Sequence, residues 1–333
     1  MRALKFIVAA FIVLAIAAFA GFRYWQAQLD RPLGIEAPTL YEVPQGAGFD
    51  RVVHDLVDRG ILASAWPYRL YKRIDPRALP PLRAGEFRLE PGMSGRQALA
   101  LLGSDRVVTY TVTFPEGWTF RQLRERLASA PKLDHRLAGL SDGEVMARLD
   151  HPDEPAEGRF FPDTYRYHKG VSDREILAQA YARMQQTLDA VWQSRDADLP
   201  LKTPYQALIL ASLIERETGA DGERRKIAGV FVRRLEKGMR LQTDPTVIYG
   251  LGDAYDGNLT KADLQRATAY NTYVIDGLPP TPIAMPGRAA LEAAVHPADG
   301  DALYFVAKGD GSHHFSSTLA EHNAAVRRYI LDR

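Results

Sequence analysis

The segment Tyr205–Gly219, YQALILASLIERETG, constrains the fold more than any other part of this sequence. When it is drawn as a helix, Leu208 and Ala211 share one side with Glu215, and other apolar residues cover most of the remaining surface. A helix that is apolar on nearly every face is a buried helix. The chain must therefore build a globular domain around this segment.

Two carboxylates, Glu215 and Glu217, lie in the last turn of this helix. At ~100° per residue they stand about 200° apart, so they cannot serve one site together. A carboxyl that shares its face with Leu208 and Ala211 is poorly solvated, which raises its pKa and keeps it protonated near neutral pH, as a general acid requires. The alternative is that both glutamates pair with nearby arginines at an ordinary helix end.

Composition narrows the class of protein. The 333 residues are 46% hydrophobic and 25% charged, an ordinary globular composition with room for an anchor and two domains. The net charge of +1 and the lack of a long basic run predict no nucleic-acid partner. Because the sequence has no cysteine, it excludes disulfides, thiolate metal sites and a cysteine nucleophile.

We expect neither a cofactor nor a metal ion. The residues His296, His313 and His314 lack the spacing and the carboxylate neighbours of a recognisable metal site. We interpret them as loop or hairpin residues, of which at most one contacts substrate.

The N-terminal region predicts a membrane anchor. Phe6–Phe22 carries no charge and follows Arg2 and Lys5, and its length is at the short end of the ~17–25 residues of a membrane span. The basic start favours a cytoplasmic N-terminus with the rest of the chain exported. The alternative is a signal peptide cleaved after Ala18-Phe19-Ala20, but the apolar run is longer than the ~7–15 residues usual for one.

Between residues 40 and 132, short strand patterns alternate with short helices. Pro44-x-Gly46-x-x-Phe49 and Pro115-x-Gly117-x-x-Phe120 form an internal repeat, each following a β-rich segment and opening an amphipathic helix. The pattern is similar to that of LysM modules, which bind the N-acetylated glycans of cell walls. The alternative is a small α/β spacer.

The next segments are helical apart from one aromatic motif. Glu157–Tyr165, EGRFFPDTY, predicts a strand that ends in a tight turn, where Asp163 caps the turn or reaches a ligand. A helix is expected from Asp173 to Trp192. We expect Gly219 to end the buried helix and Asp221 to start the next one.

Polar and aromatic residues cluster in the C-terminal third. The groups of Gln242, Thr243 and Asp244 are of the kind that bind sugar hydroxyls and acetamides, although a plain Asx-Pro turn explains them too. Tyr270–Tyr273, YNTY, leads into a proline-rich loop expected along a surface groove. Aromatic rings beside amides are typical of a sugar site. The chain then predicts a short helix at 288–295, a hairpin at 301–317 and a final helix with a Thr318 and Glu321 capping box.

Taken together, EGRFFPDTY, ASLIERETG, RLQTDPTVIYGLG, AYNTYVIDGLPPTPIAMPG, AAVHP and YFVAKGDGSHHFSSTLAEHN resemble the endolytic murein transglycosylase family, also called YceG-like or MltG. The resemblance runs from about Leu40 to the C-terminus. It implies a single N-terminal anchor, a LysM-like part and a catalytic domain that cleaves nascent peptidoglycan strands internally.

The resemblance also implies an α+β fold class and a domain plan. Residues 1–25 form a cytoplasmic stub and transmembrane helix, and residues 26–39 a linker. Residues 40–132 form a small LysM-like α/β module, and residues 133–333 a mixed α+β catalytic domain. The protein is then a single-pass protein of the inner (cytoplasmic) membrane, with its catalytic domain in the periplasm.

For the site, the resemblance implies that Glu215 is the catalytic residue, because it is the first glutamate of the family's [VI]-E-x-E-T motif. A lytic transglycosylase needs only one carboxyl, which protonates the glycosidic oxygen between MurNAc and GlcNAc and then takes the proton of the attacking MurNAc 6-hydroxyl. The product is a 1,6-anhydro end. The substrate-binding residues expected beside it are Asp163, Tyr165, Glu217, Gln242, Thr243, Asp244, Tyr270, Asn271 and Thr272.

The expected partners are peptidoglycan glycan strands, the lipid bilayer and peptidoglycan synthases. Two other functions stay open. One is a hydrolytic muramidase, which usually needs two carboxylates flanking the bond. The other is a non-catalytic scaffold that binds peptidoglycan near the machinery that makes it.

Overall fold

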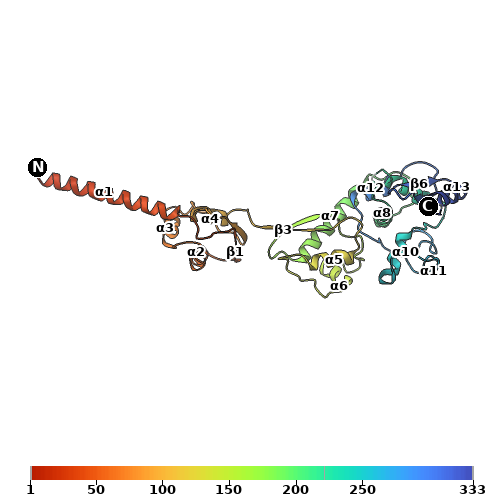
Figure 1. The fold of residues 1–333 in the computed structure, drawn as a ribbon, viewed down its shortest axis with the longest axis horizontal. Coiled ribbons are helices and arrows are strands. Elements are labelled where there is room, and N and C mark those ends of the chain that lie inside the picture. The colour runs from red at the N-terminus through yellow and green to blue at the C-terminus, as the bar shows by residue number, and fades with distance from the viewer. Residues whose placement is uncertain (1, 221, 332–333) are drawn as a thin grey trace. The chain divides into compact units, whose positions relative to one another are not determined.

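The computed structural model describes residues 2–220 and 222–331, and these form two compact units (Figure 1). The first unit contains the described residues up to Tyr110 together with Tyr167–Gly170. The second contains Thr111–Arg166 and the described residues from Val171 onward. The overall class is α+β, with short two-stranded sheets between helices, as expected.

The N-terminal helix α1, Arg2–Leu29, is long and apolar enough to cross a membrane, with a mean hydropathy of 2.6 over its most apolar window. It extends into the segment expected to be a linker. The reason is that Trp25 and Leu29 are buried in the core of the first unit, where the Trp25 indole N–H donates to the carbonyl of Pro67 at 3.0 Å.

The rest of the first unit is a small α/β structure. Its elements are β1 (Thr39–Val43), α2 (Phe49–Asp58), α3 (Trp66–Ile74), β2 (Gly85–Leu89) and α4 (Gly95–Leu102). β1 and β2 pair in antiparallel register, with Tyr41 opposite Phe87. Both rings are fully buried, as is Leu56 of α2, so both helices and strands contribute to one core.

The strands β3 (Thr109–Thr113) and β4 (Thr164–His168) pair with each other, and the division between the units runs through them. We expected a strand that ends in the Pro-Asp-Thr-Tyr turn, but this was wrong, since β4 begins inside that segment, at Thr164, and runs to His168. Pro162 has no N–H to donate to a ladder. Asp163 starts the pairing instead, because its carbonyl accepts from the N–H of Phe114 at 2.9 Å.

The second unit is mainly helical. Its elements are α5 (Phe120–Ala128), α6 (Asp142–Arg148), α7 (Asp173–Gln193), α8 (Pro204–Glu217), α9 (Arg224–Glu236), α10 (Asp244–Leu251), a 3₁₀ turn (Gly252–Ala254), α11 (Lys261–Gln265), α12 (Arg288–Val295), β5 (Tyr304–Ala307), β6 (His313–Ser316), α13 (Leu319–Val326) and a π-helical turn (Arg327–Leu331). Helix α8 packs against α7, α9 and α12 (Figure 1). Every residue from Ala207 to Ile214 is buried, so the predicted buried helix is confirmed.

Two local expectations were wrong. α8 ends at Glu217 with Thr218 in an extended conformation, so Gly219 is not its cap. The Gln-Thr-Asp-Pro-Thr segment is not only a turn, because Asp244 begins α10 with Pro245 in the first turn, where a fixed φ suits a helix. The expected helix start at Asp221 lies outside the described residues.

The structure also places residues 111–132 in the second unit, whereas we expected them in the module that ends at 132. The physical reason is the packing of α5. Its first residue, Phe120, is buried and stacks on Phe160 with 4.9 Å between the ring centroids. The short helix at 288–295, the C-terminal hairpin and the Thr318 and Glu321 capping box are confirmed.

Candidate active site

Glu215 occupies the last turn of α8, with only 6% of its side chain exposed. Its Oε2 accepts a hydrogen bond from the backbone N–H of Gly287 at 2.9 Å, and its Oε1 lies 3.9 Å from a guanidinium nitrogen of Arg224. Burial raises the pKa of Glu215, and the negative charge of Glu116 adds to this, while Gly287, Arg224 and Arg216 act in the opposite direction. The net shift is upward, so the carboxyl holds its proton more tightly than an exposed glutamate does.

A turn from a distant part of the chain lies against this carboxyl. Gly117 donates its N–H to the carbonyl of Met285 at 2.9 Å, and the N–H of Met285 donates to the carbonyl of Trp118 at 2.8 Å. The Arg216 guanidinium donates to the carbonyl of Gly117 at 3.1 Å. A Cβ built on Gly117 would lie 3.9 Å from Cγ of Glu215, so this turn lies against the side of α8 that carries Glu215.

Glu217 points to different partners, as the helical spacing predicts. Its Oε1 accepts from the hydroxyl of Thr243, a buried residue at the start of α10. Burial, reinforced by the nearby charge of Asp244, raises the pKa of Glu217 to about 7. The last turn of α8 therefore carries two carboxyls whose pKa values are both raised and whose partners differ.

Three of the expected substrate-binding residues line one cavity of ≈ 640 Å³, which we call the Asp244 cavity. They are Glu217, Gln242 and Asp244, and the aromatic side chains of Tyr273 and Tyr304 lie beside them. The hydroxyl of Tyr273 donates to Asp244 at 2.6 Å. Rings next to hydrogen-bonding groups suit the alternating apolar faces and hydroxyl edges of a sugar.

Other expected residues use their polar groups within the protein. The amide nitrogen of Asn271, a residue 1% exposed, donates to three backbone carbonyls, and its oxygen accepts from the N–H of Tyr273. The hydroxyl of Thr272 accepts from the N–H of Thr243 at 3.0 Å. The Asn271 bonds tie the Tyr-Asn-Thr-Tyr segment to α11 and the residue after it, and the Thr272 bond ties the segment to the start of α10.

The remaining expected residues also make internal contacts. Asp163 forms an ion pair with Arg183 of α7, and the hydroxyl of Tyr165 donates to the carbonyl of Phe161 at 2.6 Å. Tyr270 hydrogen-bonds the hydroxyl of Thr281 at 2.8 Å, which ties the ring to the proline-rich loop. These contacts assign all three residues to holding segments together.

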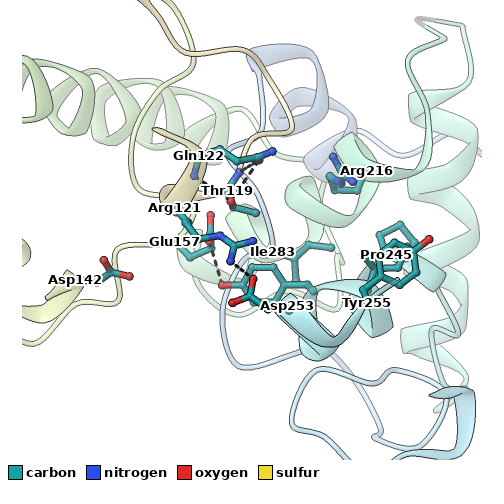
Figure 2. Close-up of a pocket in the computed structure, with 13 residues that line it drawn as sticks. Thr119, Arg121, Gln122, Asp142, Glu157, Arg216, Pro245, Asp253, Tyr255 and Ile283 are labelled. Atoms are coloured by element: carbon teal, nitrogen blue, oxygen red, sulfur yellow. Dashed lines mark hydrogen bonds and ion pairs between the residues drawn. The ribbon is translucent and has the colours of Figure 1, made fainter. Parts of the chain in front are cut away.

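Sequence reasoning missed another carboxyl with a raised pKa, Glu157, which lines a cavity of ≈ 650 Å³ (Figure 2). We call this the Glu157 cavity. Oε1 of Glu157 accepts from the N–H of Phe120 at 3.0 Å, and Oε2 accepts from the hydroxyl of Tyr249 at 3.1 Å. Burial raises the pKa of Glu157 to about 7. The only signal in the sequence was its place at the head of the aromatic motif, directly before a glycine.

The Glu157 cavity reaches the end of α8. Arg216, which bonds the turn beside Glu215, is one of its lining residues, and Figure 2 shows it facing the cavity from the side opposite Asp142. Arg121 points toward Asp253 across the cavity in the same view, and the two form an ion pair. The last turn of α8 thus contributes Arg216 to one cavity and Glu217 to the other.

The histidines have structural partners. The Nδ1–H of His313 donates to the Glu223 carboxylate at 2.7 Å, and the backbone N–H of His313 donates to the same carboxylate, which fixes the hairpin to the start of α9. His296 pairs with Asp196 at 2.6 Å. Among residues 2–220 and 222–331, no three histidine or carboxylate side chains are grouped as metal ligands.

Comparisons with known proteins place this geometry in a family. The model of the YceG-like family matches residues 41–328. An endolytic murein transglycosylase of Bacillus subtilis is 32% identical over 308 residues, which cover 87% of this chain and 84% of that protein. A second, from Streptococcus pneumoniae, is 25% identical over 364 residues, which cover 98% of this chain and 65% of that protein.

A solved structure agrees in fold. The crystal structure of a YceG-like protein from Listeria monocytogenes superposes with a TM-score of 0.54 at 28% identity, and the match covers 87% of this chain and 100% of that one. The family match spans most of the sequence and includes Glu215 and Glu157. This chain belongs to the YceG-like family.

Proposed function

We propose that this chain is an endolytic murein transglycosylase, which cuts peptidoglycan glycan strands between MurNAc and GlcNAc and leaves 1,6-anhydroMurNAc ends. The observation that carries the proposal is Glu215, a carboxyl 6% exposed at the end of a buried helix with a raised pKa. Two relatives of this family are named for the same activity. A protein that only binds glycan has no need of a desolvated carboxyl, which is costly to keep in the fold.

The reaction needs one residue that both gives and takes a proton. Protonated Glu215 donates to the glycosidic oxygen as the bond between that oxygen and C1 of MurNAc breaks. The oxygen of the MurNAc 6-hydroxyl then bonds to C1, and its proton returns to the Glu215 carboxylate. Atoms balance without water, and the enzyme leaves the cycle in its starting form.

The backbone N–H of Gly287 supports both halves of this cycle. It donates to Oε2 of Glu215, which leaves Oε1 to carry the mobile proton. The same hydrogen bond stabilises the carboxylate that forms after proton transfer, because a donor is worth most to a charged acceptor in a poorly solvated place.

The glycan strand is proposed to pass the end of α8, where both cavities meet the same helical turn. The Asp244 cavity offers the aromatic and polar groups of Tyr273, Tyr304 and Gln242 to one side of the scissile bond. The Glu157 cavity offers Tyr249 and Arg216 to the other side. Binding on both sides of the bond suits cleavage within a strand.

The location follows from the N-terminal region. Helix α1 is proposed to anchor the protein in the inner membrane, with the N-terminus in the cytoplasm and the catalytic unit in the periplasm. The β1–α2–α3–β2 order of the first unit supports a LysM-like role in holding glycan. Peptidoglycan synthases, which make the strands, are candidate partners.

Mass analysis of purified peptidoglycan digested by the full-length protein tests the function. We expect new anhydro ends within long strands, and therefore fragments of intermediate length. New reducing ends would instead identify a hydrolytic muramidase. A digest with no new ends would identify a binding protein, provided that the protein binds the glycan and is folded.

A further inference from the structure

Glu116 brings a second carboxylate to Glu215 from a segment far away in the sequence. A Cβ built on Gly287 would overlap the carboxylate of Glu116, so that side chain lies directly over this glycine. The N–H of the same glycine donates to Glu215. One glycine therefore has the Glu116 carboxylate against its Cα and the Glu215 carboxylate on its N–H.

The backbone around Glu116 is fixed. The hydrogen bonds of Gly117 and Trp118 to Met285, at 2.9 and 2.8 Å, pair the turn with the segment that ends at Gly287. Gly117 has a φ of +76°, a conformation that residues with a side chain rarely adopt. Glu116 itself is exposed to solvent, whereas only 6% of the Glu215 side chain is exposed.

The charges that face Glu215 explain why the position of the Glu116 carboxylate matters. From its own helix and from α9 come two cations, Arg216 and Arg224, and from the loop before α12 comes the N–H of Gly287. All three favour the ionised form of Glu215. Glu116 is the negative charge that opposes them, and with burial it raises the pKa of Glu215.

We propose that Glu116 is a positioning residue of the reaction centre, whose carboxylate, held over Gly287, keeps Glu215 protonated for the first proton transfer. The inference rests on the proposed role of Glu215. The same repulsion assists the second half of the cycle, because a Glu215 carboxylate that faces another carboxylate binds a proton more strongly and so is a better base toward the 6-hydroxyl.

The test is the pH dependence of anhydro-end release by the full-length protein and by Glu116→Gln and Glu116→Asp. Activity that depends on a general acid falls as pH rises through the pKa of that acid. In Glu116→Gln we expect this alkaline limb to move to lower pH by roughly 0.5–1 unit. Glu116→Asp keeps the charge and should keep the limb close to its wild-type position.

If Glu116 had only a structural role, Glu116→Gln would lower the rate by the same factor at every pH, and the alkaline limb would stay in place. That result for Glu116→Gln would overturn the proposal. Gly287→Ala gives a second, independent perturbation, since its φ of −76° accepts alanine while the new methyl group displaces the Glu116 side chain. Its limb should shift in the same direction as that of Glu116→Gln.

Titration of ¹³C-labelled glutamate carboxyls by NMR separates this inference from the proposed function. Glu215→Gln identifies the Glu215 signal, and its midpoint is compared between the wild type and Glu116→Gln. A lower midpoint in the variant supports the coupling even if the digest shows no anhydro ends, in which case only the function fails. Anhydro ends with an unmoved midpoint and an unmoved limb leave the function intact and refute the role of Glu116.

Discussion

The two Pro-x-Gly turns of the chain have the same local structure and different surroundings. Gly46 and Gly117 have φ values of +73° and +76°, and each turn is followed by a helix that begins at a phenylalanine. A Cβ built on Gly46 would meet no described atom within 4 Å beyond its chain neighbours. On Gly117 it would lie 3.7–3.9 Å from atoms of Arg216 and Glu215. The motif specifies a turn, and its neighbours decide whether that turn takes part in a site.

The helices that follow the turns differ in the same way. α2 has no side-chain hydrogen bond at its N-terminus. α5 begins with a capping box between Thr119 and Gln122, and Glu157 accepts from the N–H of Phe120. The second turn is therefore fixed at both ends, to Met285 on one side and to Glu157 on the other. Precise placement is what a group beside a proton donor requires.

The strongest test of this comparison removes Glu215, the proposed acid, which the second turn borders. Glu215→Gln keeps the shape of the side chain and accepts from Gly287 as before, but it has no proton to give. We expect the release of anhydro ends to fall by ~10²–10⁴-fold, or more because the residue also acts as base. Circular dichroism and thermal unfolding of the same sample should show a retained fold.

Glu217→Gln is the matched control, because it lies two residues away in the same helical turn and is also a carboxyl with a raised pKa. Its amide oxygen still accepts from Thr243, so we expect a much smaller loss of activity. A larger loss of activity in Glu217→Gln than in Glu215→Gln would assign the acid to the Asp244 cavity. The second turn would then border no catalytic group, like the first.

The next effect concerns Glu157, which anchors the helix after the second turn. Its pKa is about 7 in the folded protein, against a usual 4.5. Because the folded state binds this proton more tightly, the stability that it contributes is present below pH 4.5 and is lost as pH rises through 7. Glu157→Gln removes that loss, so near pH 8.5 it should be more stable than the wild type by on the order of 1–3 kcal/mol.

Chemical unfolding at pH 4.5 and pH 8.5 measures this difference. The amide oxygen still accepts from Phe120, so at pH 4.5 the variant should unfold close to the wild type. Glu217 contributes the same pH dependence to the unfolding free energy of both proteins. The difference between the two unfolding free energies therefore reports on Glu157 alone. If the unfolding free energies of the variant and the wild type differed by the same amount at both pH values, Glu157 would not take up a proton on folding.

The sequence was sufficient where local periodicity decides the outcome. Helix α8 is apolar on nearly every face, which predicted both its burial and the poor solvation of Glu215. The C-terminal hairpin and the last capping box followed from turn and cap residues in the same way. These features depend on residues within a few positions of one another.

The rest of the site depends on contacts that no local pattern encodes. Arg216 reaches the carbonyl of Gly117 across 99 positions, and Tyr249 reaches Glu157 across 92. Glu116 therefore looked like part of a repeated turn. Asn271 was expected to bind substrate, because a sequence cannot tell a side-chain amide that faces a ligand from one that donates to nearby backbone carbonyls, as Asn271 does to Asp263 and Arg266. The expected module boundary at residue 132 also came from local patterns, whereas the turn lies in the same compact unit as Glu215.

The smallest expected effect compares the two turns directly, through Gly46→Ala and Gly117→Ala. Both glycines have a left-handed φ, so alanine should cost each turn about 1–2 kcal/mol. Amide hydrogen exchange of α2 and α5 reports this cost for each turn separately. Activity should differ, since the methyl group at Gly117 lies against Arg216 and Glu215, whereas at Gly46 it meets open space. We expect a several-fold loss for Gly117→Ala and none for Gly46→Ala, and equal activities would show that contact with the turn does not matter to Glu215.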